Sequence, residues 1–224
     1  MVISTNQPNP VALQQDLVLQ YLVKEPQPAS SKKKALILMH GVGGNEENMY
    51  SLNGYFPGDL LLISARGPNA LGGGRYAWFE VDFSTGKPVI NEQQEAESRG
   101  LIHQFIRQVK QKYAVEDVYL GGFSQGAIMS CSVGLTAPET VKGIIAMSGR
   151  ILQQIRPSVQ PTPVLASLNI FVAHGLHDSV LPIAYGREAK AYLESLNVKL
   201  SYNEYPIAHQ ITAEEMADVV AWMG

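Results

Sequence analysis

Residues 118–127 of the chain read VYLGGFSQGA, and this stretch decides the fold class. An apolar strand runs into a Gly-x-Ser-x-Gly turn around Ser124, and residues 127–129 continue as a helix. A strand followed by this turn and a helix is the sequence context of a nucleophile elbow. Side chains at Gly122 and Gly126 would collide with the adjoining strand or helix, because the turn is sharp and strained. We therefore predict that Ser124 lies at the N-terminus of a helix, where the helix dipole favours negative charge on its oxygen.

Short apolar segments alternate with longer amphipathic stretches along the 224-residue chain, a pattern that predicts a parallel α/β sheet. The predicted strands are residues 17–23, 35–40, 60–65, 118–121, 143–147, 170–173 and 200–205. Apolar residues at helical spacing predict helices within the ranges 92–113, 185–196 and 216–223. Thr212 and Glu215 predict a capping box before the last helix. Two irregular stretches, 66–91 and 149–169, follow strands and are candidate walls of a ligand site, and the sequence leaves open whether the second one covers it.

Composition and charge narrow the class of protein. With 46% apolar residues, the chain can form a hydrophobic core without disulfides, so we expect one domain over residues 1–224, with 1–15 either flexible or forming an edge strand. The net charge of -3 argues against nucleic acid binding, which requires a basic face. The sequence has neither a signal-peptide pattern nor an apolar run near the roughly 20 residues that span a bilayer. We therefore expect a cytoplasmic protein without stable membrane insertion.

A serine hydroxyl is a weak nucleophile at neutral pH, so a histidine must accept its proton and a carboxylate must hold that histidine. His209 lies between the last predicted strand and the last helix, where an α/β-hydrolase places this histidine. Of the other four histidines, His103 falls within a predicted helix and His40 falls in a glycine-rich loop. His174 and His177 lie near the end of a predicted strand, and either could line the site.

The carboxylate is expected between Ser124 and His209 in the chain, just after a strand. Asp178 is the only aspartate in that interval, and it follows the predicted strand at 170–173. Glu204 also meets the chain order, but it falls within the last predicted strand. We therefore predict that Asp178 orients His209.

Backbone N–H groups are expected to bind the negative oxygen of a tetrahedral intermediate. One should come from Gln125, the residue after the nucleophile. The other should come from residues 40–44, HGVGG, which follow an early strand and are similar to the HGGG-type loop. We predict Val42 as this second donor, because the glycines on either side let the loop approach the substrate closely.

Six segments carry a resemblance that spans nearly the whole chain. They read LILMHGVGGNEENM (36–49), ARGP (65–68), RYAWFEVD (75–82), GGFSQGAIMS (121–130), VAHGLHDSVLP (172–182) and YPIAHQI (205–211). In this order they resemble the phospholipase/carboxylesterase family of α/β-hydrolases, the group that includes the acyl-protein thioesterases. The resemblance implies an α/β-hydrolase fold with a mostly parallel central sheet, flanking helices and no large lid. It also implies a catalytic triad of Ser124, Asp178 and His209, with Val42 and Gln125 as oxyanion donors.

The function implied by the resemblance is that of a serine hydrolase that cleaves carboxylic esters through an acyl-enzyme on Ser124. The absence of a long insertion favours short or water-soluble acyl groups. An alternative is an acyl-protein thioesterase or lysophospholipase that acts on longer acyl chains, which would require an apolar groove walled by residues such as Leu71, Leu152, Ile155 and Leu181. A non-catalytic binding module of the same fold is a third, less favoured interpretation. Trp78 and Phe79 match by position an aromatic pair near the acyl site of the family.

The expected partner is therefore a small ester or thioester molecule. Acyl transfer to a serine requires no cofactor, and the histidines and the lone Cys131 show no metal-ligand spacing such as HExxH. Family members are monomers or homodimers, and the sequence does not choose between these states.

Overall fold

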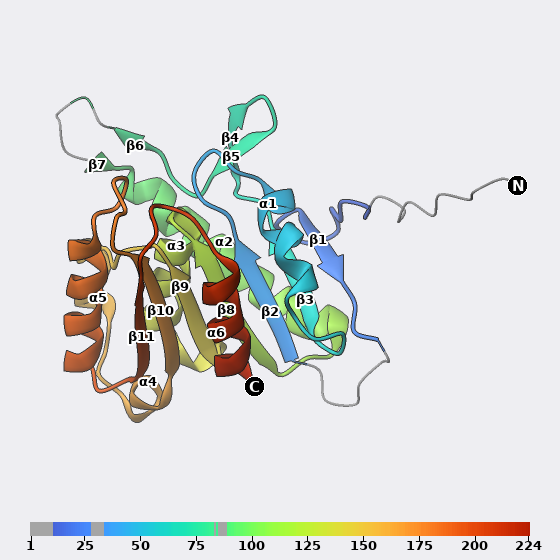
Figure 1. The fold of residues 1–224 in the computed structure, drawn as a ribbon. Coiled ribbons are helices and arrows are strands. Elements are labelled where there is room, and N and C mark those ends of the chain that lie inside the picture. The colour runs from blue at the N-terminus through green and yellow to red at the C-terminus, as the bar shows by residue number, and fades with distance from the viewer. Residues whose placement is uncertain (1–10, 28–33, 83, 85–88) are drawn as a thin grey trace, which may run out of the picture.

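A seven-stranded sheet runs through the middle of the computed structural model, which describes residues 11–27, 34–82, 84 and 89–224 (Figure 1). The strand order is β1-β3-β2-β8-β9-β10-β11. Neighbouring strands are parallel except for the edge pair of β1 and β3, which confirms the predicted mostly parallel sheet. The strands are β1 (Tyr21–Lys24), β2 (Lys34–Met39), β3 (Leu61–Ala65), β8 (Asp117–Phe123), β9 (Gly143–Met147), β10 (Asn169–Gly175) and β11 (Lys199–Tyr205).

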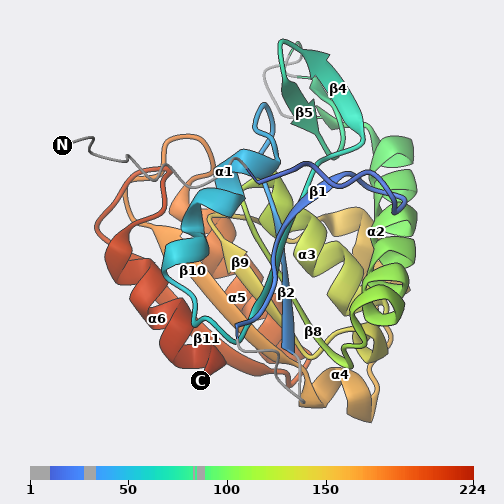
Figure 2. The same ribbon diagram turned by 90° about the vertical axis from the view of Figure 1, so that its right-hand side faces the viewer.

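Helices cover both faces of this sheet, as the edge-on view in Figure 2 shows. One face packs against α2 (Glu92–Tyr113), α3 (Gln125–Thr136) and α5 (Ile183–Ser195), and the other against α1 (Glu46–Tyr50) and α6 (Ala213–Met223). Strand β2 contributes Ile37 to the first face and Leu36 and Leu38 to the second. This burial on both sides explains why the central strands are continuously apolar.

The described residues within 66–91 form two small antiparallel hairpins beyond one end of the sheet (Figure 1). The first pairs β4 (Asn69–Gly72) with β5 (Arg75–Ala77), and the second pairs β6 (Val81–Asp82) with β7 (Val89–Ile90). These strands have only two to four residues each, which is too short for a period-two pattern to identify them in the sequence. Among the described residues, no insertion forms a large lid over the sheet.

Residues 149–169 leave the end of the sheet that carries the hairpins and reach the opposite end. They contain a 3-10 segment (Gln153–Ser158) and α4 (Pro163–Ser167), which lies at the end of the sheet away from the hairpins (Figure 1). Thr162 caps α4, because its hydroxyl accepts the Leu165 N–H at 3.1 Å. Two further 3-10 turns cover Ser51–Gly54 and Pro138–Thr140.

The first predicted strand is shorter than expected. It begins at Tyr21 instead of residue 17, and Tyr21 also forms an isolated bridge with Gln14. Residues 1–10 of the stretch predicted as flexible or as an edge strand lie outside the described residues.

The carboxyl ends of the parallel strands meet at the end of the sheet nearest the hairpins (Figure 1). Strands β2, β8, β9, β10 and β11 end there at Met39, Phe123, Met147, Gly175 and Tyr205. Ligands of open α/β sheets bind at this end, so the topology places the candidate site here.

Helix α6 contains a buried acid outside this site. The Thr212 hydroxyl accepts the Glu215 N–H at 3.3 Å, which forms one half of the predicted capping box. The Glu215 side chain is 1% exposed, and neither of its oxygens has a hydrogen bond of normal geometry to a described residue. Burial raises the pKa of this carboxyl to about 7, and the nearby Thr212 backbone offsets only part of the effect.

The parent protein is expected to lose stability as the pH rises, because the buried Glu215 carboxyl resists ionisation. We expect the Glu215→Gln variant not to show this loss. Between about pH 4.3, where an ordinary glutamate titrates, and pH 7, the folded protein holds a proton that the unfolded chain has released. The free energy of unfolding therefore falls across this window by about 1.4 kcal/mol per pH unit, or about 4 kcal/mol in all. The variant should be more stable than the parent protein by about 1–3 kcal/mol at pH 8 and similar at pH 4.5, as measured by urea unfolding.

The matched control is Glu214→Gln, because Glu214 is the exposed neighbour on the same helix turn. Its effect should be small at both pH values. Equal destabilisation of the Glu215→Gln variant at pH 4.5 and pH 8 would contradict this account.

Candidate active site

Ser124 lies at the sharp turn between β8 and α3. Its backbone has φ 55° and ψ -115°, a conformation that is costly for a residue with a side chain. A Cβ at Gly122 would lie 2.4 Å from the Gly126 carbonyl carbon, and a Cβ at Gly126 would lie 1.9 Å from the Met39 oxygen. The Ser124 N–H donates to the Met147 oxygen on β9 at 2.9 Å, which ties the turn to the sheet. The two glycines are thus required by close backbone contacts.

A continuous chain of hydrogen bonds joins three side chains that are far apart in the sequence. His209 Nε2 is 3.0 Å from Ser124 Oγ, and His209 Nδ1 is 2.6 Å from Asp178 Oδ2. Because a carboxylate only accepts, Nδ1 carries the proton and Nε2 is free to accept one from the serine. The ring of Phe123 packs on the imidazole with 4.7 Å between centroids, which further fixes its orientation.

The loop after β10 holds the carboxylate of Asp178 in place. Its second oxygen, Oδ1, accepts the backbone N–H groups of Val180 and Leu181, each at 2.8 Å. These bonds leave Oδ2 facing His209. The Asp178 side chain is buried, so it is shielded from the solvent that would weaken its interaction with the imidazole.

His174 contacts this loop from strand β10. It is buried on β10, with Nε2 2.7 Å from the Leu181 oxygen and 3.6 Å from Asp178 Oδ2. The contact with a carbonyl makes Nε2 the protonated nitrogen. His174 therefore holds the loop that contains Asp178, and it has no contact with Ser124 among the described interactions. Two other histidines lie elsewhere. His177 is exposed, and His103 lies on α2, away from this edge.

The loop at residues 40–44 passes beside Ser124. A Cβ on Gly41 would lie 3.2 Å from Ser124 Cβ. Gln125 is the first residue of α3, where backbone N–H groups have no partner within the helix. Val42 lies in the loop with its side chain 53% exposed at the mouth of the site. Both predicted oxyanion donors therefore lie beside Ser124.

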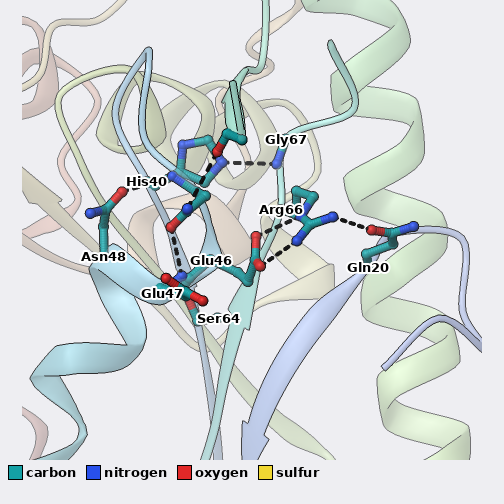
Figure 3. Close-up of polar contacts among 10 residues, drawn as sticks. Gln20, His40, Glu46, Glu47, Asn48, Ser64, Arg66 and Gly67 are labelled. Carbon is teal, nitrogen blue, oxygen red and sulfur yellow. Dashed lines mark hydrogen bonds and ion pairs between the residues drawn. The ribbon is translucent and has the colours of Figure 1, made fainter. Parts of the chain in front are cut away.

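The ring of His40 fixes the shape of this loop, as Figure 3 shows. Its Nε2 accepts the Gly67 N–H at 2.9 Å, so the proton sits on Nδ1, which is 2.7 Å from the Gly41 oxygen. Burial lowers the pKa of His40, which favours this neutral form. The Trp78 indole donates to the His40 oxygen at 3.0 Å.

An ion pair holds the segment that follows the loop (Figure 3). Arg66 binds the Glu46 carboxylate with two nitrogens, and its Nε contact is 2.6 Å. Ser64 donates to the Glu46 backbone oxygen at 2.6 Å. Burial alone would raise the pKa of Glu46. The hydrogen bonds from Arg66 and from the backbone outweigh this effect, so the pKa of Glu46 is lowered. The start of α1 is thereby fixed beside the sheet.

The side chain of Gln125 adds a contact that the sequence did not suggest. Its side-chain oxygen accepts the backbone N–H of Trp78 at 2.7 Å, and its side-chain nitrogen donates to the backbone oxygen of Phe79 at 2.6 Å. The Ser98 hydroxyl also donates to the Trp78 oxygen. These bonds hold residues 78–79 against the turn at Ser124.

A pocket of about 340 Å³ opens at Ser124. Its walls come mainly from the loop at residues 40–44, residues 79–81, α3 and the loop that follows Asp178. The lining residues are Val42, Phe79, Val81, Ser124, Gln125, Ile128, Arg150, Ser179, Val180, Leu181, Pro182 and Tyr185.

The pocket wall differs in part from the sequence prediction. Phe79 and Leu181, two of the predicted substrate-binding residues, line it. Trp78 is fully buried behind it, because its indole is engaged by the His40 backbone. Leu71 is 37% exposed on the β4–β5 hairpin, and Leu152 lines a neighbouring cavity instead. Neither leucine lines the Ser124 pocket, and loop side chains have no periodic pattern in the sequence that reveals their direction.

The described residues bear on two other kinds of feature, a metal site and a membrane span. They contain no group of three or more His, Cys, Asp or Glu side chains arranged to hold a metal ion. They also contain no helix that is both long enough and apolar enough to cross a bilayer.

Comparison with known proteins gives the chain a family. Residues 23–223 match the family model described as Phospholipase/Carboxylesterase. Acyl-protein thioesterase 1 of Kluyveromyces lactis is 29% identical over 217 residues, which cover 87% of this chain and 92% of that protein. A probable carboxylesterase of rice, Oryza sativa, is 23% identical over 216 residues, which cover 87% of this chain and 79% of that protein.

Solved structures show the same fold. The crystal structure of a carboxylesterase from Mesorhizobium loti superposes with a TM-score of 0.79 at 19% identity, over 95% of this chain and 98% of that one. The chain belongs to the phospholipase/carboxylesterase family of α/β-hydrolases and is a serine hydrolase that acts on esters.

Proposed function

We propose that the protein hydrolyses carboxylic esters in two steps, through an acyl-enzyme on Ser124. The observation that carries this proposal is the unbroken hydrogen-bond chain from Ser124 through His209 to Asp178. A serine becomes a useful nucleophile when such a base is oriented by a buried acid.

The first step transfers the acyl group to the enzyme. His209 Nε2 takes the Ser124 proton while Oγ attacks the ester carbonyl, and the N–H groups of Val42 and Gln125 bind the negative oxygen that forms. The protonated imidazole, stabilised by Asp178, then gives its proton to the leaving alcohol as the C–O bond breaks.

The second step releases the acid. Water enters the pocket, gives a proton to His209 and attacks the acyl carbonyl. The tetrahedral intermediate collapses, and the proton returns to Ser124 Oγ. The enzyme is thereby restored, with one water consumed for each ester cleaved.

The size of the pocket favours short acyl groups over long ones. Its volume of about 340 Å³ lies near the lower end for small-molecule sites. Of the four leucine and isoleucine residues predicted to wall a long groove, only Leu181 lines it. The thioesterase alternative keeps support from the similarity to acyl-protein thioesterase 1, and a thioester of a short acid would fit the same pocket.

A panel of 4-nitrophenyl esters with acyl groups from acetate to palmitate tests this proposal. We expect kcat/KM to peak at chains of about two to six carbons and to fall for longer chains that exceed the pocket. A matched oxygen ester and thioester of butyrate would then show which leaving group is preferred. A maximum at palmitate would favour the long-chain alternative, and no hydrolysis of any ester would contradict the proposed function. Cytoplasmic location and a monomeric or homodimeric state stay predictions.

A further inference from the structure

Arg150 brings a positive charge into the wall of the Ser124 pocket. Most of the remaining wall is apolar, and Ile128, Phe79 and Val81 belong to it. Arg150 and Tyr185 also line a neighbouring cavity of about 280 Å³, so the two cavities share these two side chains. Among the described residues that line the Ser124 pocket, Arg150 is the one charged residue.

The backbone before Arg150 is held firmly against the nucleophile helix. Ser148 directly follows β9 in a left-handed conformation with φ 51°, is fully buried and donates its N–H to the Ala173 oxygen at 2.8 Å. A Cβ on Gly149 would lie 2.6 Å from Ala127 Cβ on α3. Strained and closely packed turns of this kind cost free energy and occur where a side chain must be held in position.

The guanidinium of Arg150 has no anionic partner within the protein. The structure gives it no hydrogen bond or ion pair to any described residue, and every Asp and Glu of the chain is described. Its Nε is buried without a hydrogen-bond acceptor. Its only recorded polar contact among the described residues is with the ring of Tyr185, at 5.3 Å from the centroid.

Arg156, in the same region, has an anionic partner, although its Nε is also buried without an acceptor among the described residues. It stacks on Tyr192 at 4.3 Å and binds Glu188 Oε1 at 2.7 Å. Glu188 also accepts a hydrogen bond from Gln153, so it is already engaged. Buried charged groups are normally paired, and Arg150 differs from Arg156 because it lines the ligand pocket without an anionic partner among the described residues.

We propose that Arg150 is a specificity residue that binds a carboxylate carried by the ester substrate, in addition to the ester group itself. The planar guanidinium, which lies over the Tyr185 ring, has parallel N–H donors that match a carboxylate. The inference rests on the proposed acyl transfer to Ser124 and narrows its substrate class to anionic esters. The carboxylate can be carried by the acyl chain or by the leaving alcohol.

Two matched substrate pairs distinguish these sources. Mono(4-nitrophenyl) adipate and 4-nitrophenyl hexanoate have acyl chains of equal carbon number, with and without a terminal carboxylate. 4-Carboxyphenyl acetate and 4-methylphenyl acetate place the same difference on the leaving group. The measured quantity is the ratio of kcat/KM for the anionic ester to that for its neutral partner, compared between protein variants.

Arg150→Gln is expected to lower this ratio by about 10- to 100-fold in one of the two pairs, mainly through KM, because a charge-assisted bond is lost. Arg150→Lys should give an intermediate ratio, since it keeps the charge but not the planar fork. Arg156→Gln is the matched control and should leave both ratios unchanged. Circular dichroism and thermal unfolding would verify that each variant is folded.

The possible results distinguish the role of Arg150 from the proposed ester hydrolysis at Ser124. If the parent protein hydrolyses the neutral esters but Arg150→Gln changes neither ratio, the inference is wrong and the proposed function stands. A fall in both ratios for Arg156→Gln as large as for Arg150→Gln would also overturn it, because the effect would then come from net charge. If the parent protein hydrolyses no ester, both proposals fail together.

Discussion

Replacement of Ser124 by alanine is expected to reduce kcat/KM for a short ester by about 10⁴- to 10⁶-fold. The variant lacks the oxygen that lies 3.0 Å from His209 Nε2, so no acyl-enzyme can form. The residual rate would come from the oxyanion donors and from substrate binding alone. Since the hydroxyl makes no bond that holds the turn, the thermal midpoint should change little. Steady-state kinetics and thermal unfolding of the same preparation measure both effects.

Ser132→Ala is the matched control for this change. Ser132 lies on the same helix, α3, is fully buried, and its hydroxyl has no partner among the described residues. It should keep full activity. If the Ser124→Ala variant retained more than about one tenth of the parental kcat/KM, the serine would not be the nucleophile.

Asp178→Asn is expected to lower kcat by about 10³- to 10⁴-fold without unfolding the protein. The Asp178 Oδ2 that accepts the His209 Nδ1 proton at 2.6 Å would become an amide NH₂. To accept from that amide, the imidazole must carry its proton on Nε2, where it can no longer take one from Ser124. The amide oxygen can still accept the N–H groups of Val180 and Leu181, so the loop should stay in place.

Glu204→Gln separates this role from a general effect of charge. Glu204 is the other acid that chain order allowed, and it binds Arg187 through two contacts of 2.9 Å away from the pocket. That hydrogen bond with Arg187 is the main cause that lowers the pKa of Glu204 to about 2. The variant should keep its kcat. A loss as large as that of Asp178→Asn would contradict the assignment of the acid.

The sequence was sufficient to place the three side chains of the hydrogen-bond chain. Strands buried on both faces have continuous apolar runs, so β8, β10 and β11 could be located before the structure was known. Their carboxyl ends meet at one edge in a parallel sheet. Residues just after those ends, such as Asp178, therefore converge even though they are distant in the chain.

The pocket wall could be predicted only in part, because it depends on how loops pack. Trp78 and Phe79 are adjacent, yet the first is buried behind the pocket and the second lines it. Arg150 follows a correctly predicted strand, β9, and its position at that strand end was the one signal that could have drawn attention to it. The lack of an anionic partner for Arg150 can be seen only in the structure, because it depends on which acidic residues lie nearby.

Covalent labelling with a fluorophosphonate, located by mass spectrometry of proteolytic peptides, tests the activation of the serine most directly. We predict one adduct, on the peptide that contains Ser124, with much slower labelling in His209→Ala and none after unfolding in urea. Ester hydrolysis should be lost in proportion to the labelled fraction. Folded protein that hydrolyses esters but carries no adduct on Ser124, or carries it on another residue, would contradict the account.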